Sequence, residues 1–219
     1  MNEFITIIIS KYNYWAYIIL MMVGMYAMIR FFTMFFMENI EFWQALLLVL
    51  AGFTMVVGVL TAAAQFEMRK ILSFHIISQI GYMVLGLGLF TVAGVAGAIF
   101  YMAHNIVAKT NTFLAAGIVN QLRGSFELKE LGGLYKTKPF MAVLFIIPAM
   151  GLAGIPPFSG FVGKLYLIYA GFEAEKYLIT AIAVIVSRLT LFSMIKIWNE
   201  VFWKANPGGE KPEIGKVPA

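Results

Sequence analysis

Basic side chains stand in the middle of long apolar stretches of this sequence. His104 and Lys109 lie in one such stretch, Lys164 in a second and Arg188 in a third. A charge at the centre of a lipid bilayer costs about 2.5–3.5 kcal/mol on insertion scales, so each of these residues needs a reason to be there. A buried lysine can load and release a proton, whereas an arginine keeps its proton. The two lysines therefore indicate work on protons or small cations.

His104 and Lys109 are five residues apart. On a helix this spacing places them on adjoining faces, about 7.5 Å apart along the axis. Hydroxyl and amide groups that could hold water beside them are Asn105, Thr110, Asn111 and Thr112 in the same stretch, and Ser159 further along the chain. A proton relay and a seam of interhelical hydrogen bonds both fit this pattern, and for His104 both stay open. For Lys109 we favour the relay, because an ammonium holds helices together poorly.

Lys164 follows a break in an apolar stretch, at residues 154–160. Pro156 and Pro157 remove two backbone donors there and interrupt a helix. Broken helices in membranes place ions and titratable groups at exposed helix ends. We expect a helix N-terminus beside Lys164, which would favour the neutral amine. The alternative is an ammonium that snorkels to the surface. Since residues 165–172 must still reach that surface, we favour a role in ion transfer.

Two further basic residues have other settings. His75 begins an apolar stretch beside Ser73, Ser78 and Gln79, and either admits protons from that side or is a structural histidine. Arg188 cannot relay protons, and no Asp or Glu lies in the middle of an apolar segment to pair with it. We therefore expect Arg188 to contact a neighbouring subunit or an anionic lipid.

The elements that position these residues are membrane spans. The chain of 219 residues is 61% hydrophobic and 12% charged, and a span needs about 20 apolar residues. Six segments qualify: 12–36, 42–65, 71–92, 94–121, 139–172 and 177–203. We read the fifth as a discontinuous helix over 139–154 and 160–172. The expected fold class is an all-α integral membrane protein of about six transmembrane helices, one of them discontinuous.

This composition excludes several classes of function. The aqueous segments are too short for a soluble enzyme domain, and we expect no catalytic residues of that kind. The absence of cysteine excludes disulfides, thiolate catalysis and iron–sulfur ligation by this chain. The net charge of +5 comes from short loops and is no sign of nucleic-acid binding. We expect no metal and no cofactor.

Loop charges predict the orientation. One set of loops is basic, with Arg69, Lys70, Arg123, Lys129, Lys136, Lys138, Lys204, Lys211 and Lys216. The opposite set carries Glu38, Glu41, Glu173, Glu175 and Lys176. We expect the protein to lie in the plasma membrane of a prokaryotic cell. The positive-inside rule then places both termini in the cytoplasm. The predicted parts are an N-terminal cytoplasmic or interfacial segment 1–13, a transmembrane domain 14–203 and a tail 204–219. Because residues 1–11 lack the features of a cleavable signal, we expect Met1 to begin the mature chain.

Three separated stretches resemble one family. They are QFEMRKILSFHIISQIGY at 65–82, FYMAHNIVAKTNTFL at 100–114 and AGIPPFSGFVGKL at 153–165. Together they resemble antiporter-like membrane subunits, above all the D subunit of Mrp-type Na⁺/H⁺ antiporters. Relatives of that family are the proton-pumping subunits of respiratory complex I and of membrane-bound hydrogenases. The resemblance extends over about residues 14–203.

The resemblance implies a half-channel of buried lysines and histidines. It makes Lys109 and His104 relay residues and Lys164 the residue that exchanges protons with the outer side. Implied partners are H⁺ or Na⁺, lipid, and other membrane subunits of one complex. Family members are longer and have two inverted five-helix repeats, and this chain matches the second repeat with one preceding helix. Met22 stands where the family has a lysine, and Arg188 stands where it has an apolar residue.

Two functions stay open after this comparison. The preferred one is an antiporter-like subunit that contributes a proton or Na⁺ half-channel along His104, Lys109 and Lys164. The alternative is a structural, non-conducting subunit that bridges modules of such a complex, which Met22 favours because methionine holds no proton. A catalytic membrane enzyme is disfavoured by the lack of Cys, Asp and Glu inside the spans.

Overall fold

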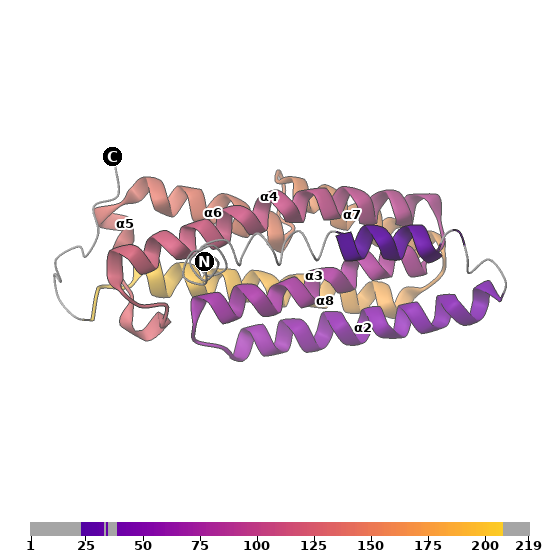
Figure 1. The fold of residues 1–219 in the computed structure, drawn as a ribbon, viewed down its shortest axis with the longest axis horizontal. Helices are drawn as coiled ribbons and strands as arrows, with labels where there is room; N and C mark the ends of the chain where they lie inside the picture. The colour runs from indigo at the N-terminus through magenta and orange to yellow at the C-terminus, as the bar shows by residue number, and fades with distance from the viewer. Residues whose placement is uncertain (1–22, 33, 35–38, 208–219) are drawn as a thin grey trace, which may run out of the picture.

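The computed structural model describes residues 23–32, 34 and 39–207. The described chain is an elongated bundle whose helices extend along one long axis (Figure 1). After a helix at Val23–Phe32, the elements are α2 Ile40–Ala64, α3 Met68–Gly88, α4 Val92–Arg123, the 3₁₀ turn η1 Leu128–Glu130, α5 Leu134–Thr137, α6 Pro139–Ala153, α7 Ser159–Glu173, α8 Tyr177–Trp198 and the π-helical turn η2 Asn199–Trp203. The predicted all-α membrane fold with one discontinuous span is confirmed.

Four of the described helices are long and apolar enough to cross a membrane. They are Ile40–Ala64, Met68–Gly88, Val92–Arg123 and Tyr177–Trp203, and they match four of the predicted segments. Large apolar side chains cover the outside of the bundle, among them Phe53 and Phe140, each 72% exposed. Water would penalise such a surface, whereas lipid solvates it. Most of the first predicted segment, including Met22, lies outside the described residues, as do 1–13 and most of 204–219.

The fifth span is two half-helices, as the paired prolines predict. Helix α6 ends at Ala153, and Gly154 follows in the left-handed conformation, with φ of 80°. Its N–H donates to the carbonyls of Met150 and Gly151 and closes the last turn of α6. Helix α7 begins at Ser159, so Pro156 and Pro157 lie in the connection. Figure 1 shows α6 and α7 in opposite halves of the long axis.

Small residues let the long helices approach closely. A Cβ atom built on Gly58 of α2 would lie 2.6 Å from the backbone nitrogen of Ser78, and one on Gly81 of α3 would lie 2.8 Å from that of Met55. Such contacts are too short for any side chain, so both positions require glycine. The Ser78 hydroxyl donates to the Met55 carbonyl at 3.1 Å and fixes the register of α2 against α3.

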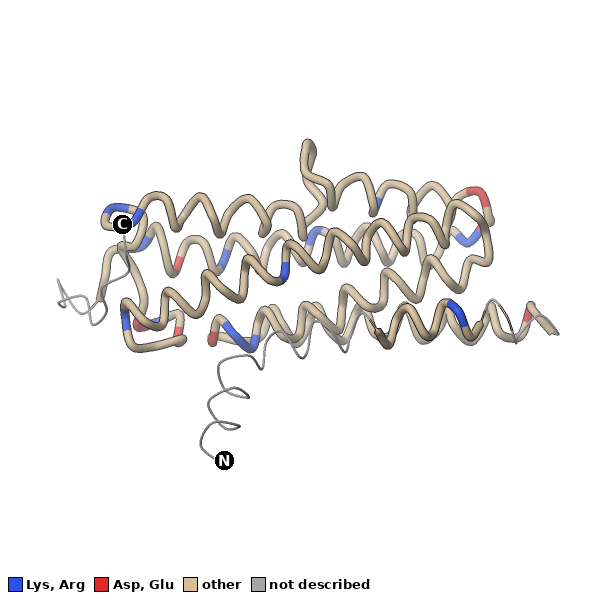
Figure 2. Tube along the Cα trace, turned by 45° about the horizontal axis from the view of Figure 1, so that its top comes forward, with Lys and Arg blue, Asp and Glu red and all other residues tan. Residues whose placement is uncertain are grey.

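Charged residues gather mainly at the two ends of the bundle, and some lie at mid-length (Figure 2). At the end where α2 meets α3, Lys196 of α8 donates to the carbonyls of Ala63, at 3.0 Å, and Gln65, at 2.6 Å. Its ammonium also lies 3.8 Å from the centre of the Phe66 ring. A cation is favoured at a helix C-terminus, so Lys196 ties α8 to the end of α2.

Candidate functional site

Buried polar side chains form two facing columns between α3 and α4. We call this set the buried polar seam, and its members are His75, Gln79 and Tyr82 of α3 with Tyr101, Asn105 and Lys109 of α4. All six side chains are fully buried. Their spacing of three or four residues puts each column on one helix face. Because α3 and α4 are antiparallel, the start of one column faces the end of the other.

Lys109 occupies one end of the seam. Its Nζ donates to the carbonyl of Leu72 at 3.2 Å, and the Thr112 hydroxyl donates to its backbone carbonyl at 3.0 Å. An ammonium has three N–H donors, and Leu72 is the one acceptor for them among the described residues. In a region without bulk water, the remaining donors call for water, for a group outside the described residues or for the neutral amine.

Lys164 lies at the other end and is fully partnered. Its Nζ donates to the carbonyls of Leu152 at 2.9 Å and Ala153 at 3.3 Å, and to the Ser187 hydroxyl at 3.0 Å. The ring centres of Tyr82 and Tyr101 lie 4.8 and 5.9 Å from it. Oxygen acceptors and aromatic faces together form a site for a cation.

The helix end beside Lys164 differs from the prediction. We expected an N-terminus, but the ammonium meets the C-terminal carbonyls of α6. Helix α7 begins at Ser159, so Lys164 lies in its second turn, and helical side chains point back toward the start of their own helix. The side chain therefore reaches the free carbonyls of α6, where the helix dipole favours positive charge.

Unpartnered polar atoms occupy the middle of the seam. Both ring nitrogens of His75, Nε2 of Gln79 and Oδ1 of Asn105 are buried without a hydrogen-bond partner in the described part of the chain. The Tyr101 hydroxyl donates to Oε1 of Gln79, and Nδ2 of Asn105 donates to the Tyr101 carbonyl at 2.8 Å. Native proteins satisfy such buried atoms with protein groups or ordered water. These atoms between the two lysines therefore call for partners outside the described residues, either water or polar groups of protein.

The two lysines do not touch. Lys164 lies against Tyr101, and Lys109 is eight residues further along α4, a rise of about 12 Å. A proton could pass between them only through intermediate groups. His75 and Gln79 are the side chains of α3 that face this interval, and His75 is the one that can bind and release a proton on either nitrogen.

His104 belongs to the helix break rather than to the middle of the seam. Its Nδ1 lies 2.8 Å from the Ser159 hydroxyl, and its ring stacks on Tyr101 with 5.9 Å between centres. A Cβ atom on Gly160 would lie 2.6 Å from the His104 Nε2, and one on Gly151 would lie 2.9 Å from its Cε1. The imidazole therefore fits a notch that glycines leave where α6 meets α7.

Three predicted residues have other positions. Asn111 is exposed on the outside of the bundle, so it does not join the seam. Thr110 has a buried hydroxyl without a partner among the described residues. Arg188 is exposed and has no hydrogen-bond or ion-pair partner within the described ranges, so its contact with a neighbouring subunit or lipid stays a prediction.

Sequence reasoning gave no role to Gln79, Tyr82, Tyr101 or Ser187. Gln79 was named there only as a neighbour of His75, whereas the other three contact predicted residues. For three of these four residues, the helical spacing from a predicted residue was a usable signal in the sequence. Gln79 and Tyr82 continue from His75 in steps of four and three residues, and Tyr101 precedes Lys109 by two helical turns. Ser187 carries no such signal, because its role depends on which helix packs beside Lys164.

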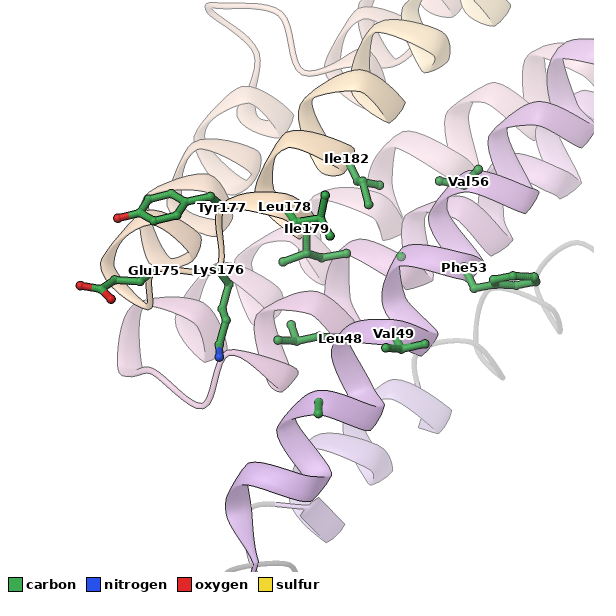
Figure 3. A pocket seen from close by; sticks show the side chains of 12 residues that line it. Leu48, Val49, Phe53, Val56, Glu175, Lys176, Tyr177, Leu178, Ile179 and Ile182 are labelled. Carbon is green, nitrogen blue, oxygen red and sulfur yellow. The ribbon is translucent and has the colours of Figure 1, made fainter.

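A large apolar groove on the chain is separate from this seam. It has a volume of about 700 Å³ and lies between α2 and the start of α8 (Figure 3). Apolar side chains such as Leu48, Phe53 and Ile182 line it, while Glu175 and Lys176 stand at one end. None of the residues that line this groove belongs to the buried polar seam.

Known proteins match this chain over most of its length. The transmembrane family described as NADH:quinone oxidoreductase/Mrp antiporter matches residues 16–190. The D subunit of the Na⁺/H⁺ antiporter of Alkalihalophilus pseudofirmus is 51% identical over 195 residues, which are 89% of this chain and 40% of that protein. Its counterpart of the same description in Bacillus subtilis is 36% identical over 194 residues, 89% of this chain and 38% of that protein.

Solved structures give the same result. A chain of the Mrp complex from Dietzia sp. DQ12-45-1b superposes with a TM-score of 0.82 at 40% identity, over 90% of this chain and 38% of that chain. A chain of respiratory complex I from Thermus thermophilus superposes with a TM-score of 0.79 at 26% identity, over 84% of this chain and 39% of that chain. The chain thus spans about two fifths of the length of these relatives.

The contact between the half-helices gives a test of the site geometry. A Cβ atom on Gly160 would lie 1.9 Å from the Gly151 carbonyl oxygen, whereas one on Gly117 of α4 would meet nothing within 4 Å. We expect Gly160→Ala to destabilise the protein by about 1–3 kcal/mol through overpacking. Gly117→Ala, as the matched control, should be neutral or slightly stabilising. Thermal unfolding in detergent micelles measures both, and equal unfolding midpoints would contradict the observed contact.

Proposed function

We propose that this chain, which belongs to the NADH:quinone oxidoreductase/Mrp antiporter transmembrane family, transfers protons along the buried polar seam. It does so as one membrane subunit of a multisubunit cation- or proton-translocating complex. The observation that carries the proposal is the pair of buried lysines at the two ends of one seam, with unpartnered polar atoms between them.

The two lysines have complementary roles in this proposal. Lys164 holds a proton in its cation site of three oxygens and two aromatic rings. Lys109 has one acceptor among the described residues and therefore holds a proton less firmly. Water in the seam would join them, with His75 accepting on one ring nitrogen and donating from the other.

His104 and Ser159 extend the route from the break. The Ser159 hydroxyl is on the exposed side of α7 and bonds to the imidazole, which reaches in to Tyr101 beside Lys164. A hydroxyl and an imidazole in contact can pass a proton inward from the outside of this chain, and water on the unpartnered Nε2 of His104 would carry it to Lys164. We propose this as the exchange route of Lys164.

Partners, ion and orientation complete the proposal. A relative at 51% identity is named as part of a Na⁺/H⁺ antiporter, so protons or Na⁺ are the proposed ions. Other membrane subunits and lipid would cover the exposed apolar helix faces, and Arg188 would meet a carboxylate or an anionic lipid there. The proposed location is the cell membrane, with both termini in the cytoplasm.

A structural role is the second candidate. Met22, which lies outside the described residues, stands where the family resemblance has a lysine. A chain without that group would connect modules of a complex and conduct nothing. In that case the buried lysines would serve packing alone.

Replacing Lys164 separates the two candidates. In the intact complex, Lys164→Ala should lower proton transport at least tenfold, since it removes the group that holds the proton. Lys164→Arg should fail as well, because a guanidinium keeps its proton. Lys204→Ala is the control, since that lysine forms an exposed ion pair with Glu200. Ion flux in membrane vesicles measures all three, and wild-type flux in both Lys164 variants would establish the structural role.

His75 distinguishes function from packing in a different way. Both of its ring nitrogens lack partners among the described residues, so Leu in its place costs no hydrogen bond to the described chain. Water bound to the imidazole would leave together with it, and removing both partners of a hydrogen bond in favour of apolar groups is nearly neutral. We expect His75→Leu to leave the unfolding midpoint nearly unchanged while it lowers proton transport at least tenfold. A loss of stability together with unchanged transport would refute the relay role.

A further inference from the structure

We propose that the Ser187 hydroxyl is a positioning group that serves both protonation states of Lys164. It accepts a hydrogen bond from the ammonium, and it donates one to the amine after the proton has left. This inference rests on the proton transfer by Lys164 proposed above, and it assigns a role to a residue of α8 outside the seam.

The hydrogen bonds around Lys164 fit the ammonium completely. Its three N–H groups point to Leu152 O, Ala153 O and Ser187 Oγ. The Ser187 hydroxyl donates its own hydrogen to Ala153 O at 2.8 Å, so its lone pairs are free to accept from Lys164. Every donor in the group has an acceptor, and the half-helix α6 and helix α8 are joined through it.

Loss of the proton changes what the site must supply. When rotation about the Cε–Nζ bond turns one N–H from its acceptor to a water molecule in the buried polar seam, the ammonium gives H⁺ to that water and becomes an amine with two N–H donors and one lone pair. Carbonyl oxygens cannot donate to that lone pair. Of the three oxygens, Ser187 Oγ alone carries a hydrogen. Rotation about the Cβ–Oγ bond turns this hydrogen from Ala153 O to Nζ, and Ala153 O can keep an N–H of Lys164.

No other described side chain that faces Lys164 is placed to donate a hydrogen bond to its neutral amine. From α3 and α4 the faces of Tyr82 and Tyr101 contact the ammonium. Their hydroxyls donate to Ala183 O and Gln79, and the Tyr82 hydroxyl also lies within hydrogen-bond reach of Ser187. His104 of α4 bonds to Ser159. Helix α6 contributes backbone carbonyls. No Asp, Glu or Arg in the described ranges contacts Nζ, and the titratable groups further along the seam, Lys109 and His75, act on it through their charge without contact.

The test measures proton transport against pH in the intact complex with Ser187→Ala and Ser187→Thr. The alanine removes one acceptor from the ammonium and one donor from the amine. Because hydrogen bonds to charged groups are stronger, the ammonium loses more stabilisation than the neutral amine does. We expect the pH of half-maximal transport to fall by about half to one pH unit. Threonine keeps the hydroxyl and should keep the wild-type midpoint. A role in packing alone would lower the rate at every pH without moving the midpoint.

Ser193→Ala is the matched control on the same helix. The Ser193 hydroxyl is buried and donates to Leu189 O at 3.1 Å, without contact to Lys164. The pH of half-maximal transport should therefore stay unchanged in this variant. A wild-type midpoint in Ser187→Ala overturns the inference, as does an equal shift in Ser193→Ala. If Ser187→Ala folds but transports nothing, a wild-type midpoint in Ser187→Thr supports the inference and an inactive threonine variant overturns it. Wild-type transport in Lys164→Ala would instead overturn the proposed function itself.

Discussion

An ammonium inside a membrane must find oxygen acceptors, and unbroken helices have none to spare. Every backbone carbonyl within a helix already accepts an N–H four residues on, and only the last turn has free ones. The break after Ala153 creates such a turn between the two halves of the bundle, and Lys164 donates to its two last carbonyls. The interruption that Pro156 and Pro157 enforce is therefore the condition for holding this lysine, and the helices around it are arranged to keep it buried.

The same constraint separates the two ends of the seam. Lys164 has an acceptor for each donor, whereas Lys109 has the Leu72 carbonyl and fully buried surroundings. Between them, His75 offers two unpartnered ring nitrogens. A structural core would have paired or replaced these groups, since unsatisfied polar atoms cost about 1–3 kcal/mol each. Their presence in a seam that links two basic residues supports the transfer of protons more than it supports packing.

Much of this arrangement could be predicted from the sequence. Apolar length predicted the four long spans, paired prolines predicted the break, and three motifs indicated the family, and these predictions are confirmed. Most of the first predicted span, 12–36, lies outside the described residues. The partners of Lys164 could not be predicted, because they come from the end of another half-helix and from α8. Asn111 shows the same limit. It is only two residues from Lys109 in the sequence, but it lies on the exposed side of α4, away from the seam.

Proton transfer between Lys109 and Lys164 requires water in the seam, and one measurement tests directly whether water is there. A high-resolution structure of the intact complex would show whether ordered water occupies the space between Lys109 and Lys164. We expect waters within hydrogen-bond distance of the His75 ring nitrogens, Gln79 Nε2 and Asn105 Oδ1. A dry seam, with these atoms paired to protein groups of a neighbouring chain or of the undescribed residues, would contradict it.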